Sequence, residues 1–309
     1  MGRDQRRDAD GGFAAAGGVS PLPAPVHAIL HAGRHQIGTV PIYLVSWNIQ
    51  NGKGCDGVTD LSRIARVVRS MGEADVVCFQ EIARHDPAFG GGADQVAELE
   101  ALFPGYEAVF GPTLIRGARQ YGNLILSRLP VLQVFNQLLP HPAEGGIKHM
   151  PRQAIEAVVE TRSGPLRVMT THLEYFSMAH RAAQVARLRA IQHEVAANEA
   201  APPKAAPSPY DLVPRPASLV LCGDFNLAPD DAEYAALFRP PLVDAWKHAR
   251  PGEPHPPTTG LFDRKQWPKG GHCRDYFAVT LDVAARIASV ECELTTDASD
   301  HQPLRLELR

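Results

Sequence analysis

The stretch SLVLCGDFN, residues 218–226, carries the signal that decides the fold of this chain. Its first half is a continuous apolar run, which is typical of a strand buried on both faces. The run ends in two polar residues, Asp224 and Asn226. A buried strand with polar residues at its carboxyl end is the pattern by which α/β folds place functional groups at the edge of a sheet.

The same pattern recurs along the chain. Polar residues end or adjoin further apolar runs, and these are Asn48 in LVSWN, Glu81 in VVCFQE, His172 in VMTTH, Asp275 in RDYF, and the pair Asp300 and His301 in ASDHQPL. Because a rigid sheet fixes positions while the loops beside it leave space for a ligand, we expect these side chains to gather at one site.

These residue types together suit one kind of chemistry, at a metal ion and a phosphate group. Glu81, Asp224 and Asp300 are hard oxygen ligands, which suit Mg²⁺ or Mn²⁺ better than zinc. Asn48 and Asn226 add neutral amides that can ligate or orient, and the two histidines offer a positive charge or an acid beside a phosphate. No serine or cysteine nucleophile accompanies them, so the pattern favours metal-assisted attack of water on a phosphate ester.

Other runs predict the remaining elements. Apolar and β-branched composition predicts strands at residues 42–46, 75–81, 106–110, 123–127, 154–160, 166–172, 277–280 and 289–294. Helical spacing predicts helices at residues 61–71, 94–103 and 178–198. Strands and helices alternate irregularly, which indicates mixed sheets instead of a simple βαβ series.

Composition narrows the function classes. The chain has 309 residues, 31 Lys and Arg, 34 Asp and Glu, and a formal net charge of −3. With 44% hydrophobic and 21% charged residues, collagen-like, coiled-coil and wholly disordered proteins are excluded. No stretch approaches the ~20 apolar residues of a membrane span, so we expect no stable membrane insertion. The charge argues against one dominant basic surface, although local basic patches remain possible.

The cysteines and the start of the chain bear on the compartment. The five cysteines form no CxxC pair, and an odd number without a framework fits a reducing compartment. The first twenty residues contain no apolar core of signal-peptide length. We therefore expect a cytoplasmic protein.

Two segments lie outside the regular pattern. Residues 1–40 are rich in Gly, Ala, Pro and charge, and predict a flexible extension to a domain at 41–309. His27, His31 and His35 would share a helical face that could bind metal, but without a carboxylate or cysteine an incidental arm is the preferred interpretation. The proline-rich stretch at 200–217 predicts a long surface loop within the domain, because the polar strand ends occur on both sides of it.

A resemblance to a known family rests on seven motifs and on their order along the chain. SWNIQNG, FQE, YGNLILSR, THLEY, GDFN, RDYF and SDHQP resemble the endonuclease/exonuclease/phosphatase superfamily, which includes deoxyribonuclease I-like enzymes, over residues 42 to 307. The resemblance implies a four-layered α/β (α+β) sandwich, in which two mixed β-sheets pack face to face with helices outside. It also places the site at one rim of the sandwich.

The resemblance further implies a metal site. Glu81 matches the main Mg²⁺ ligand of the superfamily, and Asn48 lies beside it. Asp300 resembles an acid at the metal site or directly behind it. Mn²⁺ could replace Mg²⁺ at such a site.

Five residues match the catalytic positions of the superfamily. Asp224 resembles the residue that orients or deprotonates the attacking water, and Asn226 resembles the partner that binds the scissile phosphate. His301 matches the histidine that contacts the phosphate, and Asp275 matches the carboxylate that holds its other ring nitrogen. His172 matches a strand-end histidine that contacts the phosphate or protonates the leaving group.

These features predict a Mg²⁺-dependent phosphoesterase that hydrolyses phosphodiester bonds in DNA or RNA. The first alternative is a phosphatase or phosphodiesterase for a small-molecule or lipid-headgroup phosphate ester. The second is a non-catalytic binding module on the same fold, which loss of Glu81, Asp224 or His301 would have favoured. The expected partner is a nucleic acid or another phosphate ester, and no protein partner can be inferred.

Several further residues have two interpretations. Asn123, in the motif with Tyr121 and Gly122, could face the site or form a plain turn. Two basic groups could contact substrate phosphate or be solvated surface charge; they are Lys148 with His149 and Arg152, and Arg116 with Arg119. Cys273 and Arg274 replace the apolar residues that commonly precede the acid of the RDYF motif, and no subfamily is indicated.

Overall fold

A computed structural model describes residues 40–309 except 203, 205–212 and 214. The expected extension and His27, His31 and His35 therefore lie outside the described residues. Within these described residues, twelve strands form two six-stranded sheets. The first sheet has the order β11-β12-β1-β2-β4-β3 and contains β1 (Ile42–Asn48), β2 (Val76–Arg84), β3 (Glu107–Arg116), β4 (Arg119–Ser127), β11 (Ile287–Cys292) and β12 (Leu304–Leu308).

The second sheet has the order β5-β6-β7-β8-β10-β9. It contains β5 (Val131–Leu138), β6 (Gln153–Thr161), β7 (Gly164–His172), β8 (Leu219–Asp224), β9 (Leu242–Asp244) and β10 (Asp275–Thr280). The pairs β1–β2 and β7–β8 are parallel and the other neighbours are antiparallel, so both sheets are mixed as the sequence predicts.

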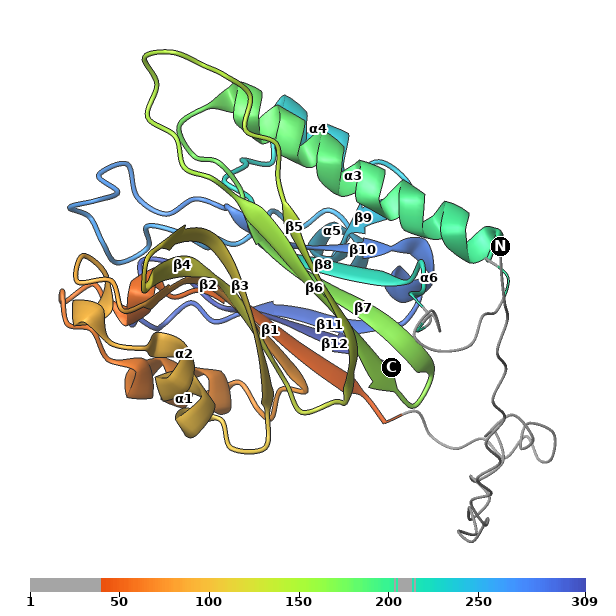
Figure 1. Ribbon diagram of the computed structural model, residues 1–309, viewed down its shortest axis with the longest axis horizontal. Coiled ribbons are helices and arrows are strands. Elements are labelled where there is room, and N and C mark those ends of the chain that lie inside the picture. Colours follow the sequence, from red (N-terminus) through yellow and green to blue (C-terminus); the bar gives the residue numbers. More distant parts are fainter. Residues whose placement is uncertain (1–39, 203, 205–212, 214) are drawn as a thin grey trace, which may run out of the picture. The chain divides into compact units, whose positions relative to one another are not determined.

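Helices cover the outer faces of the two sheets (Figure 1). Helices α1 (Leu61–Ser70) and α2 (Gln95–Leu102) lie on the first sheet, and α3 (Met178–Ala200) and α4 (Ala232–Leu237) lie on the second. Short helices follow strands at α5 (Ala245–Ala249) and α6 (Leu281–Ala284), and single 3-10 turns occur at η1 (Gln50–Gly52) and η2 (Gly90–Gly92).

Alternate residues of each central strand enter different cores. Between the sheets, Val76 and Cys78 of β2 pack in one cluster with Val220 and Cys222 of β8. The residues between them point outward: Val77 and Phe79 pack under α1 and α2, and Leu221 packs under α3 and α4. Burial of each such side chain contributes about 1.5–3 kcal/mol. The four-layered sandwich implied by the resemblance is therefore confirmed.

The long helix α3 follows the expected pattern closely. Ser177 caps its amino terminus by accepting a hydrogen bond from the backbone N–H of His180 at 3.0 Å. Its buried face includes four apolar residues at helical spacing, Val185, Leu188, Ile191 and Val195. Helix α3 and β8 flank the proline-rich stretch in the chain and share one core under the second sheet.

Three strands and the short helices α4, α5 and α6 do not appear in the sequence prediction. Strand β5 is an edge strand with polar residues on its exposed face, and β9 has three residues, so neither contains a long apolar run. Strand β12 does carry a period-two signal, because Leu304, Leu306 and Leu308 are buried and the residues between them are half-buried. Strand β2 also continues to Arg84, past the predicted end at residue 81.

A buried ion pair ties the second sheet to α3. Arg167 on β7 and Glu156 on β6 are both fully buried. Arg167 donates two hydrogen bonds to Glu156, at 3.0 and 2.9 Å, and a third to Gln192 of α3 at 2.7 Å. Arg215 donates two more to the same carboxylate, at 2.7 and 3.0 Å. The charge of the buried Glu156 is thus fully compensated.

Replacing Glu156 with glutamine should lower the free energy of unfolding by about 3–5 kcal/mol, because Arg167 would keep its charge with no counter-charge in the core. The matched control is Glu291→Gln, which removes an exposed partner of Arg305 at 3.5 Å and should cost less than about 1 kcal/mol. Denaturant unfolding of both variants measures the difference. Equal losses would show that the Glu156 pair does not act as a buried ion pair.

Candidate active site

The second sheet places three of the predicted residues in one row. His172 ends β7, Asp224 ends β8, and Asp275 begins β10. In the strand register His172 pairs with Asp224, and Asp224 pairs with Asp275. The side chains of register partners lie side by side on the same face, so backbone hydrogen bonding alone aligns this row. Gly223 is required beside it, because a Cβ there would lie 1.9 Å from the backbone oxygen of Thr171.

The first sheet supplies Asn48 and Glu81. Asn48 ends β1, and Glu81 lies in a bulge of β2 where one extra residue is accommodated opposite β4. The register passes from Phe79 paired with Leu124 to Ile82 paired with Gly122. Glu81 has φ 63°, a left-handed conformation that is uncommon for a residue with a side chain. A bulge of this kind redirects one side chain, here the Glu81 carboxylate.

Asn48 joins the two sheets through its side-chain amide. Its Nδ2 donates to Glu81 Oε1 and to Asp224 Oδ2, both at 3.1 Å. Its Oδ1 accepts from the backbone N–H of Gln50 at 3.1 Å. Asn51 Nδ2 donates to Glu81 Oε2 at 3.5 Å. The amides thus hold the two carboxylates near each other at the rim.

His301 lies between two carboxylates. Its Nδ1 is 2.9 Å from Asp275 Oδ2, and its Nε2 is 3.5 Å from Asp224 Oδ2. The Thr259 hydroxyl lies 3.0 Å from the same Nδ1 and donates to Asp275 at 3.4 Å. Burial alone would lower the pKa of His301, but the charges of Asp275 and Asp224 outweigh it and raise the pKa well above its usual value. The ring is therefore held as a cation in one orientation.

His172 has the opposite character. Burial, with the charge of Arg152 as the next cause, lowers its pKa to about 3. The Asn226 amide Nδ2 lies 3.1 Å from His172 Nε2 and donates to the Leu173 carbonyl at 3.0 Å. His172 Nε2 also lies 3.4 Å from Asp224 Oδ2, and Nδ1 lies 3.8 Å from Glu81 Oε1. Asn226 also has a left-handed backbone, with φ 51°.

The carboxylates create a site that fits a cation. Burial and the nearby charge of Asp300 raise the pKa of Glu81 above its usual value, and the Asn48 hydrogen bond and the charge of His301 offset this only in part. Asp300 accepts at Oδ2 from Gln266 Nε2 and Trp267 Nε1, both at 3.0 Å. Asp224, Asp275 and His301 form a second buried group with ligand atoms within 4.8 Å. In that group His301 Nδ1 already bonds Asp275, so the positive charge there comes from the imidazolium.

All eight predicted residues lie together at this rim. Direct contacts connect seven of them. Asp300 joins them through the Ser299 hydroxyl, which lies 3.4 Å from Asp300 Oδ1, accepts from the His301 backbone N–H at 3.2 Å and donates to the Asn48 carbonyl at 2.8 Å.

The residues for which the sequence leaves two interpretations lie in different environments. Tyr121, Asn123 and Arg152 are buried, and the Arg152 charge acts on both His172 and Tyr121. Burial and the Glu81 carboxylate raise the pKa of Tyr121 well above its usual value, which places its ring beside the site. The remaining basic residues Arg116, Arg119, Lys148 and His149 are exposed.

Sequence reasoning missed Thr259, Gln266 and Trp267. They lie in the loop between α5 and β10, which carries no periodic signal, and only the fold brings this loop to Asp275 and Asp300. Asn51 belongs to the motif SWNIQNG, but nothing in the motif indicates that its side chain contacts Glu81.

No described helix combines the length and apolar character needed to span a membrane.

No curated protein sequence matches the chain closely enough to name a relative. Among solved structures, an endonuclease/exonuclease/phosphatase from Beutenbergia cavernae DSM 12333 is 24% identical, with a TM-score of 0.62 over 87% of this chain and 71% of that chain.

Two more distant structures show the same fold. The mannosyl-6-phosphatase Bt3783 of Bacteroides thetaiotaomicron VPI-5482 is 15% identical, with a TM-score of 0.62 over 87% of this chain and 99% of that one. D. rerio TDP2 complexed with single strand DNA product is 21% identical, with a TM-score of 0.59 over 87% and 99%. The model of the Endonuclease/Exonuclease/phosphatase family matches residues 45–301. The chain therefore belongs to the endonuclease/exonuclease/phosphatase family.

Proposed function

We propose that the protein is a Mg²⁺-dependent phosphodiesterase that hydrolyses single-stranded nucleic acid. The observation that carries this proposal is the Asn48 amide bridge between Glu81 and Asp224. It brings the cation-binding carboxylate of one sheet beside the proton-accepting carboxylate of the other.

Glu81, with Asp300 beside it, would hold the metal ion, and Asn48, whose Nδ2 donates to Glu81, would orient this carboxylate. Carboxylate oxygens favour Mg²⁺, and Mn²⁺ accepts the same ligands. The raised pKa of Glu81 supports this assignment, because a bound cation would stabilise its charged form. When bound, such an ion neutralises charge on the phosphate and lowers the pKa of a nearby water.

The residues of the second sheet would perform the proton transfer. Asp224 Oδ1 accepts from the Asn226 backbone N–H at 2.9 Å, which fixes the carboxylate and leaves Oδ2 facing the rim. We assign to Asp224 Oδ2 the role of accepting a proton from the attacking water. As this proton leaves, the water oxygen bonds to phosphorus and the bond to the leaving oxygen breaks. His301 would stabilise the charge that develops on the phosphate. Asn226 and His172 would orient the same phosphate, and solvent would protonate the leaving oxygen.

A row of aromatic side chains favours nucleic acid as the substrate. Trp267 donates to Asp300, Tyr175 lies 6.1 Å from Trp267 between ring centroids, and Phe176 lies 5.0 Å from Tyr175. Tyr175 and Phe176 are 42% and 44% exposed, and Lys148 Nζ lies 4.7 Å from the Phe176 ring. Exposed rings with an adjacent cation are typical of surfaces on which unpaired bases stack.

Two other functions fit the site less well. A small phosphate ester or lipid headgroup would leave the aromatic row without a role, although one relative in fold is named as a mannosyl-6-phosphatase. A non-catalytic binding module would not need Glu81, Asp224 and His301 together, and all three are present.

The substrate assignment is tested with a panel of single-stranded DNA, RNA, plasmid, abasic duplex, sphingomyelin, inositol phosphates and a small chromogenic phosphodiester, each with Mg²⁺ and with Mn²⁺. We expect single-stranded nucleic acid to give the highest kcat/KM. Replacing Tyr175 and Phe176 with alanine should raise KM for an oligonucleotide by roughly ten-fold or more, and should leave the chromogenic ester unaffected.

Tyr43→Ala is the matched control, because Tyr43 stacks with Arg305 at 4.3 Å on β1, the strand whose far end carries Asn48. It should change neither substrate. A preference for inositol phosphate or sphingomyelin, with no effect of the Tyr175 and Phe176 changes, would support the small-ester alternative instead.

A further inference from the structure

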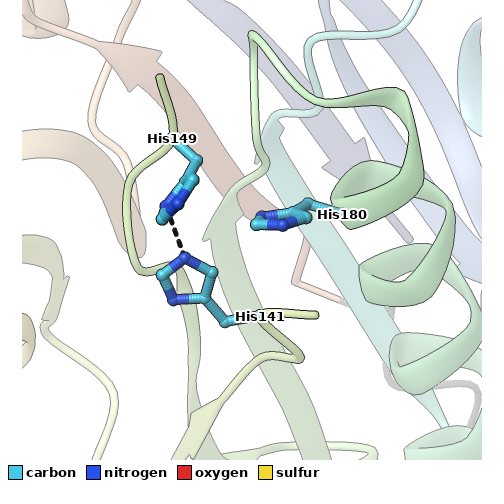
Figure 2. A group of neighbouring side chains, drawn as sticks. All are labelled: His141, His149 and His180. Atoms are coloured by element: carbon cyan, nitrogen blue, oxygen red, sulfur yellow. Dashed lines mark hydrogen bonds between the residues drawn. The ribbon is translucent and has the colours of Figure 1, made fainter. Parts of the chain in front are cut away.

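A cluster of three histidines lies outside the residues assigned to catalysis. His141 and His149 belong to the loop between β5 and β6, and His180 lies in the first turn of α3 (Figure 2). One ring nitrogen from each lies within 4.8 Å of the other two. The ring centroids are 4.3, 4.8 and 5.0 Å apart. The three imidazoles therefore point toward a common centre.

His180 is the strongest indication that this centre binds something. Its side chain is fully buried, and within the described part of the chain neither ring nitrogen has a hydrogen-bond partner. A neutral imidazole carries one donor and one acceptor, and burial of both without partners is rare and costly. A ligand at the centre would satisfy the nitrogen that faces it.

His141 and His149 show how the other two rings are arranged. His141 Nε2 lies 2.5 Å from His149 Nδ1. Imidazoles whose ring nitrogens converge in this way present the lone pairs that bind a metal ion.

The surroundings hold the cluster in place and add a carboxylate. Glu144 Oε2 lies 3.7 Å from His180 Nε2 and accepts a hydrogen bond from the Ser177 hydroxyl, the same hydroxyl that caps α3. Glu174 accepts from the backbone N–H groups of Met150 and Phe176 at 2.8 and 2.9 Å. These bonds attach the loop to the residues that precede α3.

We infer that His141, His149 and His180 form a zinc-type metal site that is separate from the catalytic carboxylates, with Glu144 beside His180. Three imidazoles bind zinc tetrahedrally when water or another ligand takes the fourth position. Tetrahedral bonds of 2.0–2.1 Å separate two ligand nitrogens by about 3.3 Å, and the observed separations span this value from 2.5 Å to within 4.8 Å.

The ion would have a structural role. It would fasten the loop between β5 and β6 to α3, and this loop ends near Arg152, whose charge acts on His172. Lys148, which packs on Phe176, lies in the same loop. The site would thus fix the position of basic residues beside the catalytic rim without taking part in the reaction.

The test uses the full, untagged chain, stripped with a chelator and reloaded with Zn²⁺ in the presence of excess Mg²⁺. We expect about one zinc ion per chain by elemental analysis, and a higher melting temperature than the stripped protein, because an ion that binds only the native state stabilises it. Co²⁺ in place of Zn²⁺ should give the intense visible absorption of tetrahedral nitrogen coordination.

The decisive variant is His141→Ala with His149→Ala, since both side chains are exposed and the fold should tolerate their loss. It should lose the zinc, the cobalt spectrum and the thermal shift. His193→Ala, an exposed histidine on the same helix, should keep all three, as should Glu81→Gln at the catalytic rim.

Two outcomes would overturn the inference. One is a wild-type chain that takes up no zinc under these conditions. The other is a double variant that still binds one zinc ion with the same cobalt spectrum, because the ligands would then lie elsewhere in the chain. Neither outcome depends on the hydrolytic activity, so the proposed function would stand or fall separately.

Discussion

A chain in which His301 is replaced by alanine should turn over its substrate roughly two to four orders of magnitude more slowly than the wild type. The reason is that His301 is held as a cation between Asp275 and Asp224, with its Nε2 at the rim where the phosphate would lie. Steady-state kcat, measured at saturating substrate and Mg²⁺, gives the size of the effect.

Asp275→Asn should have a smaller effect, because the imidazole remains but loses the negative charge that favours its protonated form. The double variant should be little slower than His301→Ala alone, since Asp275 then has no ring to orient. Multiplication of the two defects would contradict this coupling. Thermal melts of all three variants exclude loss of folding as the cause.

Glu81→Gln should lower kcat by roughly 100- to 1,000-fold at ordinary Mg²⁺ concentration, the scale expected when a group that stabilises charge in the transition state is lost. Glutamine keeps the shape of the side chain and removes the charge that would hold the cation. Raised Mg²⁺ or Mn²⁺ should therefore restore part of the activity, which a titration of kcat against metal concentration would show.

The matched control is Glu73→Gln, because the Glu73 side chain is 87% exposed and pairs with Arg128 at the surface. Its rate and metal dependence should equal those of the wild type. A Glu81→Gln enzyme with near-normal rate and unchanged metal dependence would remove Glu81 from the metal site.

The sequence predicts the central strands well because they are buried on both faces. In β8, for example, Leu219 and Leu221 enter one core while Val220 and Cys222 enter another, so the run is apolar throughout. The same strands end in polar residues, which is why the sequence alone indicates the catalytic candidates. What the sequence could not supply is the register that places His172, Asp224 and Asp275 in one row.

The basic stretch from Lys148 to Arg152 shows that residues close together in the sequence need not share one role. The sequence suggests one cluster, but the fold gives each residue a different environment. Lys148 packs on Phe176, His149 joins the histidine cluster, and Arg152 is buried where its charge acts on His172. These environments depend on contacts with α3 and β7, which are distant in the chain and have no local signal.

The backbone at Glu81 and Asn226 has a consequence for engineering of this protein. A left-handed conformation costs most residues with a side chain roughly 1–2 kcal/mol and costs asparagine less, and both positions adopt it. Glycine would relieve this cost at either position, and at position 81 it would also remove a half-buried negative charge. Selection for heat resistance alone would therefore enrich inactive variants, so a directed-evolution programme would have to select for turnover in parallel.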